Sequence, residues 1–92
     1  MELEHIIKSP NSKKKWRAVF SNGKHTDFGD SSMEDYTQHG DKKRRHNYIL
    51  RHIKDLNTND PTKAGYLSLF ILWGNHTDIN KNIKLYKKTF NL

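Results

Sequence analysis

The sequence contains no cysteine, which excludes disulfide bonds and thiolate metal sites. Long apolar runs are absent too, because no stretch approaches the roughly 18 residues needed to cross a bilayer. The N-terminal segment MELEHIIKSP carries acid where a signal peptide is basic, and its apolar core is short. We therefore expect a protein of the cytoplasm or nucleus that does not act at a membrane.

Hydrophobic residues are scarce, at 33% of the chain against 29% charged residues. Such a balance approaches that of disordered chains, but the aromatic content of 11% and well-spaced leucines and isoleucines indicate a real core. A chain of 92 residues is expected to form one domain, residues 1–92, with a modest core.

The first third of the chain, residues 1–29, has the pattern of β-strands. HIIK is short and β-branched, and KWRAVF alternates so that Trp16, Ala18 and Phe20 share one face. The Asn22-Gly23 pair predicts a two-residue hairpin turn, after which HTDF returns as a strand. We therefore expect an antiparallel meander of about three strands.

The rest of the chain, residues 30–92, is expected to be mainly helical. The acidic segment GDSSMEDYTQHG favours a short helical turn over residues 32–38, with Ser31 or Ser32 as its cap. The chain then continues through Gly40 into longer helical patterns.

Asp41 predicts the cap of a basic helix that ends near Asp55. Ile49, Ile53 and Leu56 are spaced four and three residues apart on this helix. This spacing places them on one side, so we expect Ile49 and Ile53 to lie in the core.

Two further helices are expected. Asp60 and Pro61 predict the cap and first residue of a helix that includes the apolar run YLSLFILW and ends at Gly74. Thr77 or Asp78 caps a last helix, whose apolar stripe consists of Ile79, Ile83, Tyr86 and Phe90. The expected fold class is α+β, with the meander packed against about three α-helices.

Positive charge dominates the chain, with 17 Lys and Arg against 10 Asp and Glu and a formal net charge of +7. Basic residues concentrate in the segments 13–17, 42–54 and 81–88. Clusters of this kind are typical of phosphate binders, although the charged outer faces of ordinary helices can look the same. The candidate nucleic-acid contacts are Lys14, Lys15, Arg17, Lys42, Lys43, Arg44, Arg45, Arg51, His52 and Lys54.

Two aromatic residues near these cations, Trp16 and Tyr36, invite a base-stacking interpretation. Trp16 shares its strand face with Ala18 and Phe20, however, so we favour a place in the core for it.

No catalytic motif is present: HExxH, Walker, GxSxG and CxxC patterns are all missing. A cluster of carboxylates near His39 could bind a divalent ion and serve a nuclease; its members would be Asp30, Glu34 and Asp35. Turns and helix caps use the same residue types for ordinary reasons. We therefore expect no enzyme activity, no cofactor and no metal.

The order of three motifs, FGDSSMEDYTQHGDKKRRHNYILRH, NDPTKAGYLSLFILWGNHT and NIKLYKKTFNL, resembles a family of small proteins encoded by nucleocytoplasmic large DNA viruses of algae and amoebae. The resemblance covers residues 14–92. It rests on Phe28-Gly29, Asp35-Tyr36-Thr37, His39, Tyr48, Arg51-His52, Pro61, Ala64-Gly65, Leu67-Ser68, Leu72-Trp73, Tyr86-Lys87 and Phe90.

One departure from the family pattern is that Asn57 to Asn59 occupy the place of a tryptophan-bearing loop. The resemblance implies a giant-virus origin and a protein located in the host cytoplasm or nucleus or packaged in the virion. It names no substrate.

Charge and resemblance together lead to two hypotheses. The first is a small basic viral protein that binds nucleic acid, DNA rather than RNA, through phosphate contacts with little sequence specificity. The second is a minor capsid or internal virion protein that binds acidic surfaces of capsid proteins.

Overall fold

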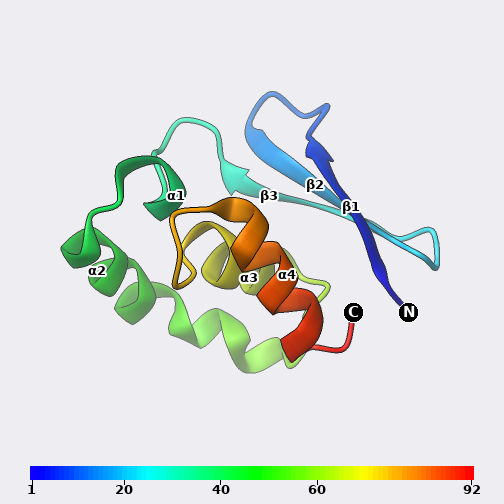
Figure 1. Ribbon diagram of the computed structural model, residues 1–92. Coiled ribbons are helices and arrows are strands. Elements are labelled where there is room, and N and C mark those ends of the chain that lie inside the picture. Colours follow the sequence, from blue (N-terminus) through cyan, green and yellow to red (C-terminus); the bar gives the residue numbers. More distant parts are fainter.

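The computed structural model describes residues 1–92. It contains three strands followed by helical elements: β1 (Leu3–Lys8), β2 (Lys14–Phe20), β3 (His25–Asp30), α1 (Tyr36–His39), α2 (Lys42–His52), η1 (Ile53–Thr58), α3 (Ala64–Leu67), η2 (Ser68–Leu72) and α4 (Ile79–Thr89). The strands form one antiparallel sheet in the order β1-β2-β3 (Figure 1). The expected α+β architecture, a three-stranded meander followed by helices, is confirmed.

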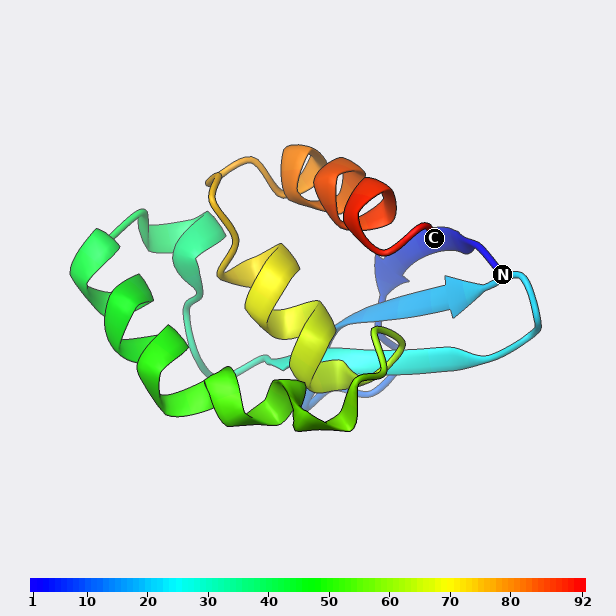
Figure 2. The same cartoon turned by 90° about the horizontal axis from the view of Figure 1, so that it is seen from below.

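The helices are arranged around α3. Figure 2 shows α3 between α2 and α4, with the sheet beyond it. The core forms where α3, η2 and α4 meet the sheet; its buried side chains include Phe20, Phe28, Leu67, Ile71 and Tyr86. None of the helices combines the length and the apolar character needed to span a bilayer.

The hairpin between β2 and β3 lies where predicted, but its turn is longer than two residues. Gly23 has a φ of +86°, whereas Asn22 does not have a positive φ. The Gly23 N–H donates to the Phe20 carbonyl at 3.0 Å, and the Phe20 N–H donates to the Lys24 carbonyl at 2.9 Å. This is the pattern of a turn followed by a left-handed glycine, which needs positive φ at one residue only.

The alternating pattern of β2 is confirmed. Ala18 and Phe20 are buried, and Trp16 is half-buried against the same core. Tyr36 is buried as well, with 6% of its surface exposed. The buried Tyr36 ring therefore lacks the free face that base stacking requires, and the packing of Trp16 against the core agrees with the place favoured for it.

Helix α1 differs from its prediction, because Asp35 and not a serine caps it. The Asp35 carboxylate accepts from the Thr37 N–H at 2.9 Å, and the Gln38 side chain accepts from the Asp35 N–H at 3.0 Å. This reciprocal capping box starts the helix at Tyr36. Ser32 instead donates from its N–H and its hydroxyl to the Asp30 carboxylate, so that it belongs to the preceding turn.

Helix α2 begins as predicted, since the Asp41 carboxylate accepts from two backbone N–H groups of its first turn. Its predicted core contacts were wrong. Ile53 is 56% exposed, and Ile49 is only half-buried and lies outside the core cluster. The chain changes from an α-helix to the 3₁₀-helix η1 at Ile53, and the shorter repeat turns this side chain away from the core.

The third helix starts later than predicted. The Asp60 carboxylate accepts from the N–H and hydroxyl of Thr62, so it forms a local turn, and α3 begins at Ala64 after Lys63. Helix α3 continues directly into the π-helical stretch η2, where the Trp73 N–H donates to the Ser68 carbonyl at 3.1 Å. The predicted central core helix ending before Gly74 is thus present.

The last helix, α4, follows the prediction closely. Asp78 is its cap and accepts from the Asn80 N–H at 2.9 Å. Tyr86 is buried, and the rest of the predicted stripe packs against the core: Ile79, Ile83 and Phe90.

Candidate nucleic-acid interface

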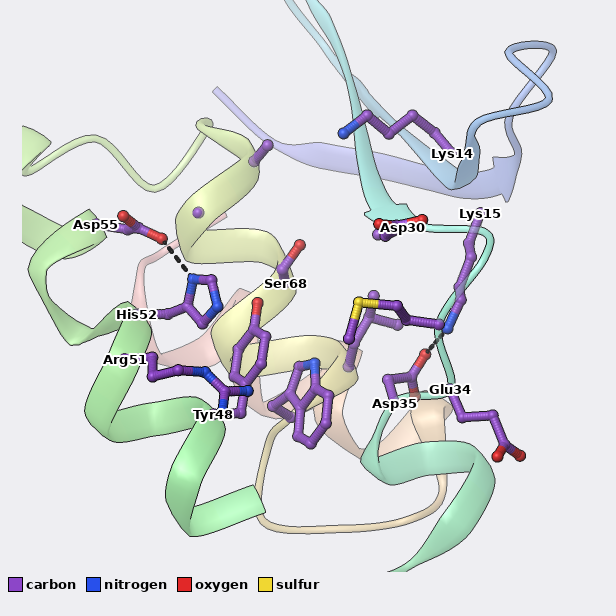
Figure 3. A pocket seen from close by; sticks show the side chains of 16 residues that line it. Lys14, Lys15, Asp30, Glu34, Asp35, Tyr48, Arg51, His52, Asp55 and Ser68 are labelled. Carbon is purple, nitrogen blue, oxygen red and sulfur yellow. Dashed lines mark hydrogen bonds and ion pairs between the residues drawn. The ribbon is translucent and has the colours of Figure 1, made fainter. Parts of the chain in front are cut away.

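A cleft of about 290 Å³ lies between the sheet and α2. The start of β2 contributes Lys14 and Lys15, and the end of β3 contributes Asp30 (Figure 3). Helix α2 contributes Arg51 and the rings of Tyr48 and His52. The cleft therefore brings together cations from two of the three basic segments.

Stacked rings form one wall of the cleft. Tyr48 lies on Trp73 with ring centroids 4.1 Å apart and planes inclined by 4°, and His52 stacks on the other side of Tyr48 at 4.1 Å. Burial raises the pKa of the Tyr48 phenol to about 12, and the nearby Asp55 carboxylate raises it further in the same direction. The Asp55 carboxylate lies 3.2 Å from Nδ1 of His52 and fixes the imidazole in the stack.

Two residues of β2 that were predicted to contact nucleic acid are paired with acidic side chains of the protein itself. The Lys15 ammonium donates to the Asp35 carboxylate at 2.7 Å and to Gln38 at 2.6 Å. The Arg17 guanidinium donates to both oxygens of Asp27 at 2.7 and 3.1 Å. This pair holds the pKa of the Asp27 carboxyl below its usual value and raises that of Arg17.

Arg45, a third predicted contact, holds the fold together instead. Its Nε donates to the carbonyls of Trp73 and Gly74 at 3.0 and 2.9 Å, and a terminal nitrogen donates to Asn75 at 3.0 Å. It thus satisfies carbonyls at the end of η2, and its guanidinium carbon lies 5.6 Å from the ring centroid of Tyr36. We therefore remove Lys15, Arg17 and Arg45 from the set of candidate contacts.

His52, also a predicted contact, is half-buried and pairs with Asp55. The remaining predicted cations are exposed, and their side chains form no hydrogen bond or ion pair within the chain: Lys14, Lys42, Lys43, Arg44, Arg51 and Lys54. Five of them lie on α2 and η1. Arg44 and Arg51 are seven residues apart, so they lie on the same side of α2, separated by about 10 Å. Arg51 faces the cleft, which Lys14 lines from β2 (Figure 3).

The cleft also contains carboxylates, namely those of Asp30, Glu34, Asp35 and Asp55. Lys15 neutralises Asp35, and hydrogen bonds from Ser32 lower the pKa of Asp30. Phosphate would therefore meet unpaired positive charge at the exposed cations of α2 rather than among these carboxylates.

The alternative of a metal-binding cluster of Asp30, Glu34 and Asp35 near His39 has no support in the structure, because no group of three His, Asp or Glu residues is placed to hold a metal ion. His39 Nδ1 accepts from the Asp41 N–H at 2.9 Å, and its Nε2 is buried without a hydrogen-bond partner. The Trp73 ring lies beside the imidazole, with centroids 5.3 Å apart.

A second cavity, a groove of about 330 Å³ between α2 and α4, was not predicted from the sequence. Its signal in the sequence is Leu85, which lies outside the apolar stripe of α4 and is 43% exposed. Leu50 and Ile53, on α2 and η1, are also exposed, by 63% and 56%.

Comparison with known proteins places the chain in a family but gives it no function. Neither the curated proteins nor the solved structures contain a match. A family described as "Family of unknown function (DUF5754)" matches residues 4–52, just over half of the 92 residues. The matched region extends from β1 to the end of α2 and so includes the cations on both sides of the cleft. The chain belongs to this family, DUF5754.

Proposed function

We propose that this protein binds nucleic acid through phosphate contacts made by the exposed cations of α2 and η1, and that it is not an enzyme. The observation that carries the proposal is the set of five exposed, unpartnered cations between Lys42 and Lys54. Arg45, in the same helix, has protein partners for its guanidinium, so the sequence and fold distinguish a structural arginine from free ones.

The placement of these cations supports a binding role. Lys42, Lys43 and Arg44 occupy the first turn of α2, where positive charge is unfavourable next to the helix dipole. The Asp41 cap offsets part of this effect. Positive charge that lowers helix stability and has no partner inside the protein is readily explained by a partner outside it.

Low sequence specificity follows from the residue types. Long, exposed lysine and arginine side chains without supporting hydrogen bonds are suited to phosphate oxygens rather than to base edges. Arg44 and Arg51 lie about 10 Å apart along the axis of α2, which is about three times the axial rise of roughly 3.4 Å per phosphate of one duplex strand. The resemblance to proteins of large DNA viruses favours DNA over RNA, and packaging in the virion.

A second candidate function is that of a minor capsid or internal virion protein that binds acidic protein surfaces. The exposed apolar side chains Leu50, Ile53 and Leu85 favour it, because they lie near cations and have no obvious use in phosphate binding.

Fluorescence anisotropy of a labelled duplex of about 20 base pairs, and of its single strand, tests the first proposal at several salt concentrations. We expect micromolar or tighter binding that weakens steeply with salt. The Arg44→Ala/Arg51→Ala variant should lower the salt slope by about two.

The matched control is Lys84→Ala/Lys87→Ala, which removes the same charge from exposed positions of α4. It should bind almost as tightly as the unmodified protein. Equal weakening by both double variants would show that net charge alone, and not α2, determines binding. Absence of binding at low salt, with the protein folded, would refute the proposal.

A further inference from the structure

The groove between α2 and α4 is mainly apolar. Nine of its 14 lining residues are hydrophobic. Its floor comes from η2, with Leu69 and Phe70, and from Trp73, which follows η2. Its walls come from α2 and η1 on one side and α4 on the other; these residues are Ile49, Ile53, Leu56, Leu85, Tyr86 and Phe90.

Exposed side chains mark both walls. Ile53 is 56% exposed and Leu85 is 43% exposed, one on each side of the groove. Covering apolar surface contributes roughly 25 cal/mol per Å². A partner that covers both side chains would therefore gain substantial binding free energy.

Positive charge surrounds the groove, and no Asp or Glu lines it. On α4, Lys81 and Lys88 lie four residues before and three residues after Leu85, so all three share one side of the helix. On α2, Lys42 lies seven residues before Ile49, two turns away on the same side. Arg45 lines the groove itself, but the Trp73 and Gly74 carbonyls bind its guanidinium.

We propose that this groove binds an amphipathic helix of a partner protein, with an apolar stripe flanked by Asp and Glu. Ile49 and Leu56 at the two ends of this wall are seven positions apart, which matches the spacing of three anchors at positions i, i+3 or i+4, and i+7 of a partner helix. Acidic residues beside the stripe would meet Lys42 on one wall and Lys81 and Lys88 on the other.

Charge complementarity decides between possible occupants. A second copy of this chain has a net charge of +7 and its helices are lysine-rich, so it would bring like charges together around the groove. A nucleic acid would bring phosphates to the rim but nothing that fills an apolar floor of Phe70 and Leu69. An acidic amphipathic helix satisfies both the floor and the rim. This proposal does not depend on nucleic-acid binding.

Binding of designed peptides to the whole protein tests the inference. The probe is a labelled helical peptide of about 18 residues, long enough to hold some helix alone, with leucines at i, i+4 and i+7 and glutamates beside them. One control peptide has lysine at each glutamate position, and another has alanine at each leucine position. We expect micromolar binding of the acidic peptide and at least about tenfold weaker binding of both controls, because charge and apolar anchors each contribute.

Protein variants locate the site. Ile53→Glu and Leu85→Glu should each abolish binding of the acidic peptide. Leu50→Glu is the matched control: Leu50 is 63% exposed on the same helix but does not line the groove, so binding should fall by less than about threefold. Circular dichroism verifies that each variant is folded, and the exposure of all three positions makes that the expected result.

Several outcomes would overturn the inference. They are a folded protein that does not bind the acidic peptide, equal binding of the acidic and lysine peptides, and a Leu50→Glu effect as large as that of Ile53→Glu. Self-association in sedimentation equilibrium that Ile53→Glu removes would assign the groove to a second copy. Displacement of the peptide by duplex DNA, when Arg44→Ala/Arg51→Ala leaves peptide binding unchanged, would assign it to nucleic acid.

Discussion

Tyr48 of α2 lies flat on Trp73, with the ring centroids 4.1 Å apart and the ring planes within 4° of parallel. This contact is central to the attachment of α2, because no residue of that helix is fully buried. Helix α2 is otherwise held by the Arg45 hydrogen bonds, the Asp41 cap and half-buried side chains. The stack and the Arg45 hydrogen bonds are thus the main specific contacts that fix the helix presenting the free cations.

We predict that Tyr48→Ala loosens α2 selectively. Loss of the stack and of the buried ring area should lower the free energy of unfolding by about 2–3 kcal/mol. Hydrogen exchange should accelerate in α2 more than in β2 or α4. Tyr48→Phe keeps the ring and should preserve the protection of α2; equal exchange in both variants and the unmodified protein would show that the stack does not hold the helix.

We predict a large difference between two neighbouring arginines. Arg45→Ala leaves the Trp73 and Gly74 carbonyls without their donor and should lower the free energy of unfolding by about 1.5–3 kcal/mol. Arg44→Ala removes an exposed side chain without partners and should change it by less than about 0.5 kcal/mol. Urea denaturation measures both, and equal effects would contradict the structural role of Arg45.

Local features of the fold could be predicted from the sequence, and long-range ones could not. The strands, the Asp41 cap and the Asp78 cap depend on neighbouring residues, so their patterns are visible in the chain. The start of α1 was missed because serines and aspartates compete as caps over a few residues. The exposure of Ile53 depends on a change of helix type, which spacing alone does not reveal.

The candidate site was predicted in part for the same reason. The basic character of α2 can be seen in neighbouring residues of the chain. Which cations are free and which are paired within the protein depends instead on residues far away in the sequence. Lys15 pairs with Asp35, which is 20 residues away in the sequence, and Arg45 donates a hydrogen bond to the Trp73 carbonyl, which is 28 residues away. The groove was missed because its walls come from two helices that only the fold brings together.

We predict that Asn82 is among the least replaceable residues of α4. Its side chain is 1% exposed and links three backbone groups, donating to the Ile71 and His76 carbonyls at 2.8 and 2.7 Å and accepting from the His76 N–H at 3.1 Å. Asn82→Asp turns an oxygen toward two carbonyls, and Asn82→Leu leaves all three groups without a partner. Both should lower the free energy of unfolding by about 2–4 kcal/mol in thermal or urea denaturation.

Asn80→Asp provides the control, because Asn80 is exposed at the start of the same helix. A negative charge there is favourable with respect to the helix dipole, so stability should stay the same or rise slightly. A loss as large as that of Asn82→Asp would mean that charge on α4, and not the buried hydrogen bonds, causes the effect.

We predict that the protein loses stability as the pH rises above 10. Burial raises the pKa of Tyr48 to about 12 and also raises that of Tyr86. Above pH 10 the unfolded chain therefore loses tyrosine protons that the folded protein keeps, and the free energy of unfolding falls. Urea denaturation across this range, combined with tyrosine absorbance, measures the effect. Tyr48→Phe should flatten the decline, and ionisation of all tyrosines near pH 10 in the folded protein would contradict it.

We predict that the free energy of unfolding also falls at acid pH, where it decreases as the pH is lowered. Hydrogen bonds from Arg17 lower the pKa of Asp27, and backbone N–H groups lower that of Asp41. The stability that these carboxylates contribute is present above their ordinary pKa near 3.8 and is lost as the pH falls below it. Asp27→Asn should flatten the decline in denaturation curves, whereas Glu4→Gln, at an exposed position without partners, should leave it unchanged.

In the π-helical stretch Ser68–Leu72, the backbone hydrogen bond joins residues five apart rather than the four of an α-helix. The turn therefore contains one extra residue. It amounts to an insertion that the helix absorbs without a loop, and Phe70 of the groove floor lies inside it. A relative that has one residue fewer here would have a regular helix and a differently shaped floor. Gain or loss of a single codon in this stretch would therefore reshape the floor of the groove without a change in the length of any loop.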